Sequence, residues 1–367
     1  MSSVPARLAV LVNLVPPYRV CLLESLAERF QVRVMHSGRE PNRTTWQAEP
    51  RPGRVEYHQS SGWVLNRKVA GSSGVYRHRF LHITPGYWKD LKTFDPAVIL
   101  SAEMGFRTLL AIRYGKRRGI PVVIWWEGTP HTERSIGFSR RIVRRFVARR
   151  ATKWIASGKG SVDYIRSLGV PMEKIVQTQI GIDESAFLDA SPTHQLLPRP
   201  ALLFVGELIE LKGLEYLLHA AASLQAEGNQ FSLTVVGDGP QRSALEQLGE
   251  TLGIKHVTFL GALKPEAMPG VYRSADCLVF PTLGDVWGVV VNEALWSGIG
   301  VLASRHAGAS ELLDPSSRFD PLDPESFRAV LARFLASGTT SPTPQRLRSC
   351  SELAEEMANA LGPLVVT

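Results

Sequence analysis

The sequence has few cysteines and no long apolar run. Its three cysteines, at positions 21, 277 and 350, are far apart and odd in number, with no metal-ligand spacing. This pattern predicts neither a disulfide framework nor a zinc site, and it is typical of a reducing compartment. The sequence contains no stretch of about 20 uninterrupted apolar residues, so it predicts no membrane-spanning helix. The first residues lack the pattern of a secretory leader, because the apolar segment 8–15 is too short and is expected to be a strand.

Low-complexity segments and short internal repeats are also absent from the sequence. The composition is that of a globular protein, with 44% hydrophobic and 21% charged residues. A chain of 367 residues is too long for one small core, so we expect two domains.

Positive charge is concentrated in the first half. Residues 1–190 hold 30 Lys and Arg against 15 Asp and Glu, a balance of +15. Residues 191–367 hold 12 against 19, a balance of −7. A basic half joined to an acidic half favours an anionic surface or acceptor as the partner of the first half, although arginines can also serve only to keep a surface soluble.

Apolar runs alternate with helical patterns along both halves, which predicts a parallel α/β architecture. In the first half the expected strands are 8–12, 32–35, 97–100, 122–126 and 153–156, and the expected helices 18–30, 107–118 and 139–150. In the second half the expected strands are 201–205, 232–236, 256–260, 277–280 and 301–303, and the expected helices 214–226, 241–252, 267–274, 324–336 and 344–361. No element is assigned within 37–95.

The proline-containing segment 188–200 lacks periodicity and reads as a connection between domains. We therefore expect a first domain over 1–190, a linker over 191–200, a second domain over 201–343 and a terminal helical segment over 344–367.

The segment from Asp285 to Glu293 places two carboxylates eight residues apart, just after an apparent strand. Eight residues are about two helical turns, so a carboxylate at the mouth of the helix and one a little way down it can share a face. Gly288 near the turn places backbone N–H groups at a helix N-terminus, which favours phosphates. The pattern suits a ligand with phosphates and several hydroxyl groups, such as a sugar nucleotide. An ordinary helix start with acidic residues is the alternative.

A second strand–loop–helix segment runs from Phe204 to Gly213. Gly206 is expected to permit a tight turn, and Lys212 supplies a point charge suited to phosphate. A solvated lysine at a helix start is the alternative for Lys212. In the segment 235–241, Val-Val-Gly-Asp-Gly-Pro-Gln, the two glycines and the proline are expected to have an architectural role.

Together these segments resemble the retaining family 4 glycosyltransferases, which have the GT-B fold. Asp285 stands where the Glu-x7-Glu signature of that family has its first Glu, and Glu293 matches the second. Residues 181–187, 235–241 and 306–311 resemble further family segments, so the resemblance covers nearly the whole chain and is faintest over 37–95. It implies an α/β fold of two Rossmann-like β/α/β domains facing across a cleft, with the last helix crossing back to the first domain.

The resemblance also implies the donor-binding roles. Glu293 would accept hydrogen bonds from the ribose hydroxyls, Asp285 would contact a donor-sugar hydroxyl, and Lys212 would bind the diphosphate. The remaining donor-site residues carried over by position are Gly206, Leu260 beside the base, and Trp287, Gly288 and Val289 beside the sugar and phosphates. Glu207 stands where the family has an arginine, and its carboxylate would repel a diphosphate unless it points away.

On the acceptor side, Glu127 follows the strand 122–126, where family members often carry a histidine. It is expected near the transferring sugar, and a surface loop carboxylate is the alternative. Arg19, after the first strand, is expected to bind a donor phosphate or an anionic acceptor, and a solvated helix-start arginine is the alternative.

The segment 139–150 predicts an amphipathic helix with Ile142, Val143, Phe146 and Val147 on one side. The opposite side is expected to carry Arg140, Arg141, Arg144, Arg145 and Arg149. This helix either packs its apolar side on the sheet or rests its basic side on an anionic membrane. We find no nucleic-acid-binding motif.

The resemblance implies a retaining glycosyltransferase that moves a sugar from a UDP- or GDP-sugar to a hydroxyl of a glycan or lipid-linked acceptor. The residues expected to act in catalysis are Glu127, Asp285 and Lys212. No metal and no tightly bound cofactor is expected, and the expected location is the cytoplasm, at the inner face of the plasma membrane. The alternatives are a non-catalytic GT-B binding module and a sugar-nucleotide epimerase or phosphorylase of the same fold.

Overall fold

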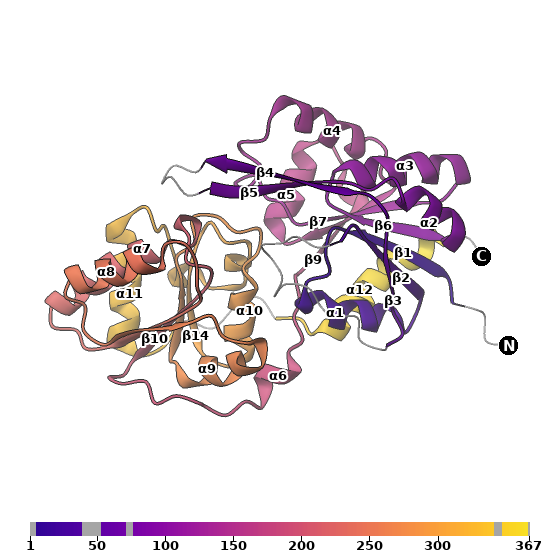
Figure 1. Cartoon of the computed structure of the whole chain (residues 1–367). Helices are drawn as coiled ribbons and strands as arrows, with labels where there is room; N and C mark the ends of the chain where they lie inside the picture. The colour runs from indigo at the N-terminus through magenta and orange to yellow at the C-terminus, as the bar shows by residue number, and fades with distance from the viewer. Residues whose placement is uncertain (1–4, 39–52, 71–75, 341–346, 366–367) are drawn as a thin grey trace. The chain divides into compact units, whose positions relative to one another are not determined.

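The computed structural model describes residues 5–38, 53–70, 76–340 and 347–365. It divides into two compact units, the first formed by Met1–Asp183 with Arg348–Thr367 and the second by Glu184–Leu347 (Figure 1). Each unit is built around a parallel sheet with helices on both faces. The predicted α/β class with two Rossmann-like halves is confirmed.

The sheet of unit 1 has the strand order β3-β2-β1-β6-β7-β8-β9. Its strands are β1 Arg7–Val12, β2 Gln31–His36, β3 Glu56–Gln59, β6 Val98–Ala102, β7 Val122–Trp126, β8 Lys153–Ser157 and β9 Ile175–Thr178. The order reverses between β1 and β6, and ligands of open α/β sheets bind beyond the strand carboxyl ends at such a point. A separate antiparallel hairpin is formed by β4 Trp63–Ala70 and β5 Tyr76–Ile83.

Alternate residues of the central strands face two different sets of helices. Leu8 and Val10 belong to a core that includes residues of α1 (Pro17–Leu26) and α12 (Cys350–Leu361), whereas Ala9 and Leu11 belong to a second core. The helices of that second core are α2 Tyr87–Phe94, α3 Phe106–Arg118, α4 Phe138–Ala148 and α5 Lys159–Ser167. Because both faces are covered, the strands read as continuous apolar runs.

Helix α12 brings the end of the chain back to unit 1, where it lies against α1 (Figure 1). It begins at a capping box in which Ser349 and Glu352 satisfy each other's backbone N–H groups. Leu353, Met357 and Leu361 are fully buried in the core that contains β1. The predicted helix 344–361 therefore starts at Cys350, and its first positions up to 346 lie outside the described residues.

The sheet of unit 2 has the order β12-β11-β10-β13-β14-β15. Its strands are β10 Ala201–Val205, β11 Ser232–Val236, β12 Val257–Gly261, β13 Cys277–Phe280, β14 Gly300–Ser304 and β15 Arg318–Phe319. Its helices are α6 Ser185–Leu188, α7 Leu214–Ala226, α8 Arg242–Thr251, α9 Met268–Ser274, α10 Val289–Trp296 and α11 Pro324–Ser337. Again the order reverses near the first strand, between β10 and β13.

Some predicted elements differ from the structure. The helix expected over 18–30 ends at Leu26, and the hairpin β4–β5 and helix α2 occupy part of the unassigned region 37–95. The segment 191–200 has no helix or strand and contacts unit 2, since the Thr193 N–H donates to Ser274 Oγ at 3.0 Å. Within the described ranges, no helix is long and apolar enough to cross a membrane.

Candidate active site

The loop between β13 and α10 carries the predicted carboxylate Asp285. Helix α10 begins at Val289, so Asp285 lies in the loop four residues before the helix, whereas Glu293 lies within it. The turn into the helix requires a glycine, because Gly288 has a φ of +96° and a Cβ there would lie 2.5 Å from the Phe280 ring.

Asp285 is held in place by the backbone of the loop that follows β14. Its N–H donates to the carbonyl of His306 at 3.1 Å, and its own carbonyl accepts from the Gly308 N–H at 3.2 Å. A Cβ on Gly308 would lie 2.1 Å from the Val286 carbonyl oxygen, so only glycine allows this approach. The two loops therefore fix the backbone position of Asp285 together.

Lys212 forms an ion pair with Asp285. Its Nζ donates to Asp285 Oδ2 at 2.7 Å, and both side chains are mostly buried. Lys212 closes a short 3₁₀ turn, Glu210–Lys212, and the next residue, Gly213, has a φ of +69°. The structure thus joins two residues that the sequence predicted separately, on segments 73 positions apart.

Glu293 accepts a hydrogen bond from the hydroxyl of Tyr272 on α9, at 2.6 Å. Burial raises the pKa of Glu293, and the Tyr272 hydrogen bond offsets only part of this rise. For Tyr272 itself, burial and then the charge of Glu293 raise the pKa well above its usual range. The pair presents a partly buried carboxylate with one oxygen already engaged, which leaves the other oxygen able to accept from a ligand hydroxyl.

Trp287 is almost fully buried, and its indole N–H donates to Asn292 Oδ1 at 2.7 Å. Its side chain therefore anchors the start of α10 to the protein interior. The backbone N–H groups of Gly288 and Val289 stand at the beginning of α10, where a helix has no acceptors of its own for them. Their donation to an anion stays a prediction.

The other predicted donor-site residues lie near the ends of β10 and β12. Glu207 follows β10 with an exposed side chain, and Leu260 is the second-last residue of β12. Gly206 does not have a positive φ, and a Cβ there would meet the Phe204 ring at 3.4 Å, so its own conformation does not require glycine. The residue that needs to be glycine is Gly237, whose added Cβ would lie 1.9 Å from the Gly206 carbonyl oxygen.

In unit 1 the two predicted residues Arg19 and Glu127 are paired with each other. The Arg19 guanidinium contacts the Glu127 carboxylate and lies 4.3 Å from the centroid of the Trp125 ring. Burial alone would lower the pKa of Arg19, but the charge of Glu127 outweighs it and the pKa is raised. Glu127 is therefore a mostly buried carboxylate neutralised by a stacked arginine, not a solvated loop residue.

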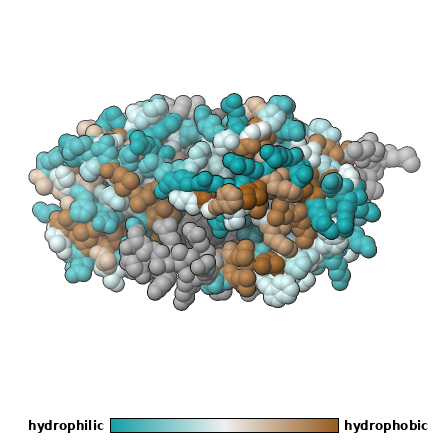
Figure 2. All heavy atoms as spheres, turned by 90° about the horizontal axis from the view of Figure 1, so that it is seen from above, coloured by the Kyte–Doolittle hydropathy of each residue, from teal (hydrophilic) through white to brown (hydrophobic). Residues whose placement is uncertain are grey.

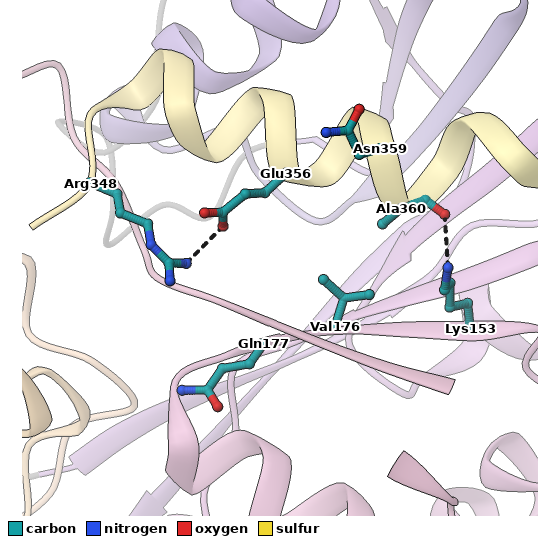
Figure 3. Close-up of a pocket in the computed structure, with 7 residues that line it drawn as sticks. All are labelled: Lys153, Val176, Gln177, Arg348, Glu356, Asn359 and Ala360. Carbon is teal, nitrogen blue, oxygen red and sulfur yellow. Dashed lines mark hydrogen bonds and ion pairs between the residues drawn. The ribbon is translucent and has the colours of Figure 1, made fainter. Parts of the chain in front are cut away.

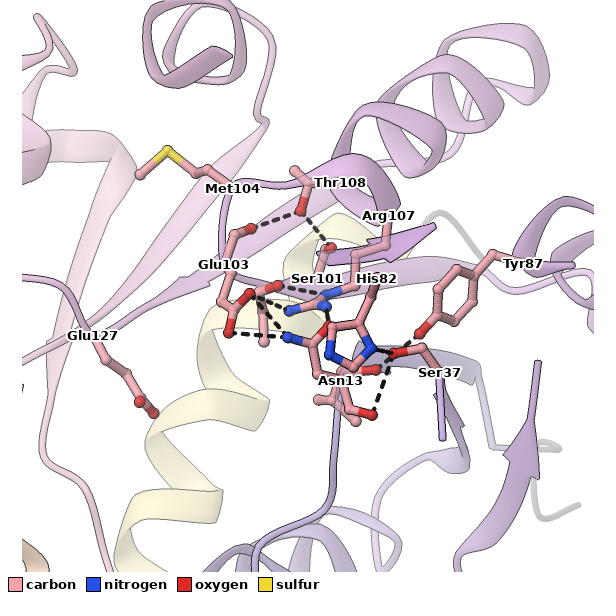
Figure 4. A network of polar contacts seen from close by, with 12 residues as sticks. Asn13, Ser37, His82, Tyr87, Ser101, Glu103, Met104, Arg107, Thr108 and Glu127 are labelled. Atoms are coloured by element: carbon pink, nitrogen blue, oxygen red, sulfur yellow. Dashed lines mark hydrogen bonds and ion pairs between the residues drawn. The ribbon is translucent and has the colours of Figure 1, made fainter. Parts of the chain in front are cut away.

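A polar network that the sequence analysis did not identify lies where the sheet order of unit 1 reverses (Figure 4). Asn13 follows β1 and Glu103 follows β6, and the Asn13 amide donates to the Glu103 carboxylate at 3.3 Å. Arg107 on α3 pairs with Glu103 at 2.9 Å and also contacts Asn13. The sequence did contain a signal for this network. Glu103, in Ser-Ala-Glu, comes directly after β6, the buried strand next to β1.

Glu103 has a backbone conformation that is rare for its residue type, with a φ of +67°. Burial tends to raise the pKa of its carboxyl, but Arg107 and Arg19 outweigh this and lower the pKa. The side chain remains largely accessible to solvent. A non-glycine residue with positive φ costs free energy, and such strain is concentrated at functional sites.

Arg144 was predicted to lie on the basic surface of helix α4, and the structure corrects this prediction. It is buried, with its guanidinium 3.0 Å from Glu133 and 4.6 Å from the centroid of the Trp126 ring. Conversely, Ile142 and Phe146, predicted to face the sheet, are exposed. The inward side of α4 is formed by Val143 and Val147, as predicted, together with the stacked Arg144.

Unit 1 also has a groove of about 390 Å³ between the strands β8 and β9 and helix α12 (Figure 3). An Arg348–Glu356 ion pair of 2.8 Å crosses its end. None of the predicted site residues lines it; the lining residues are Lys153, Val176, Gln177, Arg348, Glu356, Asn359 and Ala360.

Two family models match the chain, and together they cover most of it. Residues 17–181 match the "Glycosyl transferase 4-like domain" and residues 193–355 match "Glycosyl transferases group 1".

Individual relatives agree with the family models. An MMP alpha-(1->4)-mannosyltransferase from Mycolicibacterium hassiacum is 26% identical, with 68% of this chain and 61% of that protein matched. An alpha-D-kanosaminyltransferase from Streptomyces kanamyceticus is 29% identical, over 45% of this chain and 41% of the relative. The chain thus spans less than two thirds of the length of these curated relatives.

Among solved structures, HepE from Anabaena in complex with UDP and glucose has the same fold. Its TM-score is 0.66, at 16% identity, with 97% of this chain and 95% of HepE covered. Family models over both halves and this shared architecture lead to one conclusion: the chain belongs to the group 1 glycosyltransferases with the GT-B fold.

Proposed function

We propose that this protein transfers a sugar, with retention of anomeric configuration, from a nucleotide-sugar to a hydroxyl of a glycan or lipid-linked acceptor. The observation that carries the proposal is the Lys212–Asp285 ion pair at 2.7 Å, on the loop that leads into α10. A cation beside a helix N-terminus suits a diphosphate leaving group, and the carboxylate suits a sugar hydroxyl. Glu293, further along α10, would take the ribose.

No metal is part of this proposal, because Lys212 and the N–H groups of α10 can stabilise the charge that develops on the leaving diphosphate. For retention we propose attack from the face that the diphosphate leaves, with a diphosphate oxygen taking the proton of the acceptor hydroxyl. Asp285 is occupied by Lys212, so we assign it to binding the sugar and not to forming a covalent bond.

On the acceptor side, we assign Glu127 and Glu103 to orienting the acceptor hydroxyls. Both follow neighbouring strands of unit 1, and each contacts an arginine. We propose the cytoplasm as the compartment, which agrees with three cysteines that form no disulfide.

The first test is a thermal-shift panel with UDP, GDP, ADP and TDP, in which UDP is the first choice because HepE binds it. A nucleotide at about 100 times its dissociation constant should add roughly 2.7 kcal/mol of stability. Glu293→Gln should reduce the shift through weaker but measurable binding, whereas Glu325→Gln, an exposed carboxylate on α11, should retain it in full. No shift with any nucleotide would overturn the donor site.

Product analysis then separates the alternatives. Incubation with the matching nucleotide-sugar and a panel of acceptors should give a new glycosidic bond, whose anomeric coupling in NMR reports retention. Nucleotide binding without any turnover would favour the binding module, and conversion of the donor without a new glycosidic bond would favour an epimerase or phosphorylase.

A further inference from the structure

Helix α4 exposes a stripe of large apolar side chains. Phe138 is 79% exposed, Ile142 53% and Phe146 40%. They recur every four residues, so they lie on one side of the helix. The helix is anchored to unit 1 through Val147 and Arg144, and among the described residues the three apolar side chains of this stripe stay at least 40% exposed.

Arginines flank the stripe on the same exposed side. Arg141, Arg145 and Arg149 fall within about one residue step of it on the helix, and their side chains are exposed. The Arg150 guanidinium lies 4.4 Å from the centroid of the Phe146 ring. The residues of α4 include no acid, so the surface is apolar and positively charged at once. Figure 2 shows hydrophobic and hydrophilic side chains interleaved on the face that includes α4.

This combination fits one partner in particular. The interface of an anionic membrane accepts apolar side chains at the level of the acyl chains and binds arginines at the lipid phosphates. A second copy of the same helix is disfavoured, because its arginines would repel those of the first. A purely electrostatic partner, such as an acidic protein, leaves the three large apolar side chains in water.

We propose that α4 lies in the interface of an anionic membrane, with Phe138, Ile142 and Phe146 inserted among the acyl chains and the flanking arginines at the headgroups. This interaction is separate from sugar transfer and does not depend on it. It would hold unit 1 at a surface where lipid-linked acceptors are present.

The experiment is flotation of the full chain with vesicles of phosphatidylcholine alone or mixed with phosphatidylglycerol. We expect flotation only with the anionic vesicles. The triple variant Phe138→Ser, Ile142→Ser, Phe146→Ser should lose at least about tenfold in binding. A matched control, Met172→Ser with Leu322→Ser, removes two other exposed apolar side chains and should bind as the wild type does.

A fluorescence measurement tests separately whether α4 inserts into the membrane. In Phe138→Trp, vesicles with brominated acyl chains should quench the added fluorescence relative to the wild-type background, and high salt should reverse this only in part. Unchanged circular dichroism and thermal midpoint in the triple variant establish that it folds. Wild-type protein that does not float with anionic vesicles at low salt, or a triple variant that binds like the wild type, overturns the proposal.

Discussion

Lys212 and Asp285 neutralise each other across two loops that the chain brings together from segments 73 positions apart. The cation expected to bind the diphosphate therefore already has a partner before a donor arrives. A nucleotide must share this lysine with the carboxylate, and that competition makes a direct test of the pair possible.

We expect Asp285→Asn to bind the nucleoside diphosphate more tightly, by roughly threefold or more, because it frees the charge of Lys212. The same variant should lose transfer, since the sugar hydroxyl loses its acceptor. Lys212→Met should weaken nucleotide binding about tenfold, or about 1.4 kcal/mol. Calorimetric titration measures both changes, and equal affinity of Asp285→Asn and wild type would place the diphosphate away from Lys212.

The raised pKa of Glu293 predicts pH-dependent nucleotide binding. Ribose hydroxyls donate to the ionised carboxylate, so affinity is present above the raised pKa and is lost as pH falls through it, from a point above the usual 4.5. Without a nucleotide, the pH dependence of protein stability has the opposite sign. The fold favours the protonated form of Glu293, so the contribution of this residue to the free energy of unfolding declines as pH rises through its pKa in the folded state.

Titrations of nucleotide binding between about pH 8 and pH 5 check this, with Glu293→Gln as the reference. The variant retains the titration of the nucleotide phosphate, and the difference between the two curves isolates Glu293. Tyr272→Phe removes the hydrogen bond that lowers the pKa, so its loss of affinity should begin at higher pH. Parallel curves for wild type and Glu293→Gln would contradict the ribose assignment.

Gly308→Ala should disrupt the site through the backbone. The added Cβ would lie 2.1 Å from the Val286 carbonyl oxygen, so the loop that carries Asp285 has to move. We expect a loss of about 2–4 kcal/mol in urea-induced unfolding and a loss of transfer. Gly249→Ala is the matched control in unit 2, because its Cβ would lie 3.8 Å from Val257 within a helix and should stabilise by up to about 1 kcal/mol.

Glu103→Gly separates strain from function in unit 1. Glycine adopts a positive φ without penalty, which offsets the lost ion pair with Arg107, so the thermal midpoint should change little. Transfer should fall while nucleotide binding stays unchanged, because we assign the residue to the acceptor side. A drop in stability with full transfer activity would make Glu103 a structural residue only.

Much of the fold could be predicted because buried parallel strands are continuous apolar runs. The run Val122–Trp126 is the strand β7 with the predicted bounds. The hairpin β4–β5 could not be predicted, since its sequence mixes arginine, histidine and aromatic residues and its strands belong to neither main sheet. Each of its two strands forms because it pairs with the other, not because its own sequence has a strand pattern.

Similar limits apply to the candidate site. Spacing and resemblance together made Lys212, Asp285 and Glu293 candidates, but they could not show that the helix begins only at Val289. On α4 the helix itself was predicted, but its inward side was chosen by hydrophobicity. The structure instead buries Arg144, because Glu133 and the Trp126 ring satisfy its charge. Such a choice depends on residues distant in sequence, as does the network around Glu103.

The position of α12 has a consequence for the order in which the protein is made. Its side chains complete the core around β1, yet they are separated from the rest of unit 1 by all of unit 2. During synthesis, unit 2 has its full sequence before unit 1 does. The apolar surface of α1 and the central strands is therefore covered only after residues 350–361 have left the ribosome, so unit 1 completes its core after all of unit 2 has been synthesised.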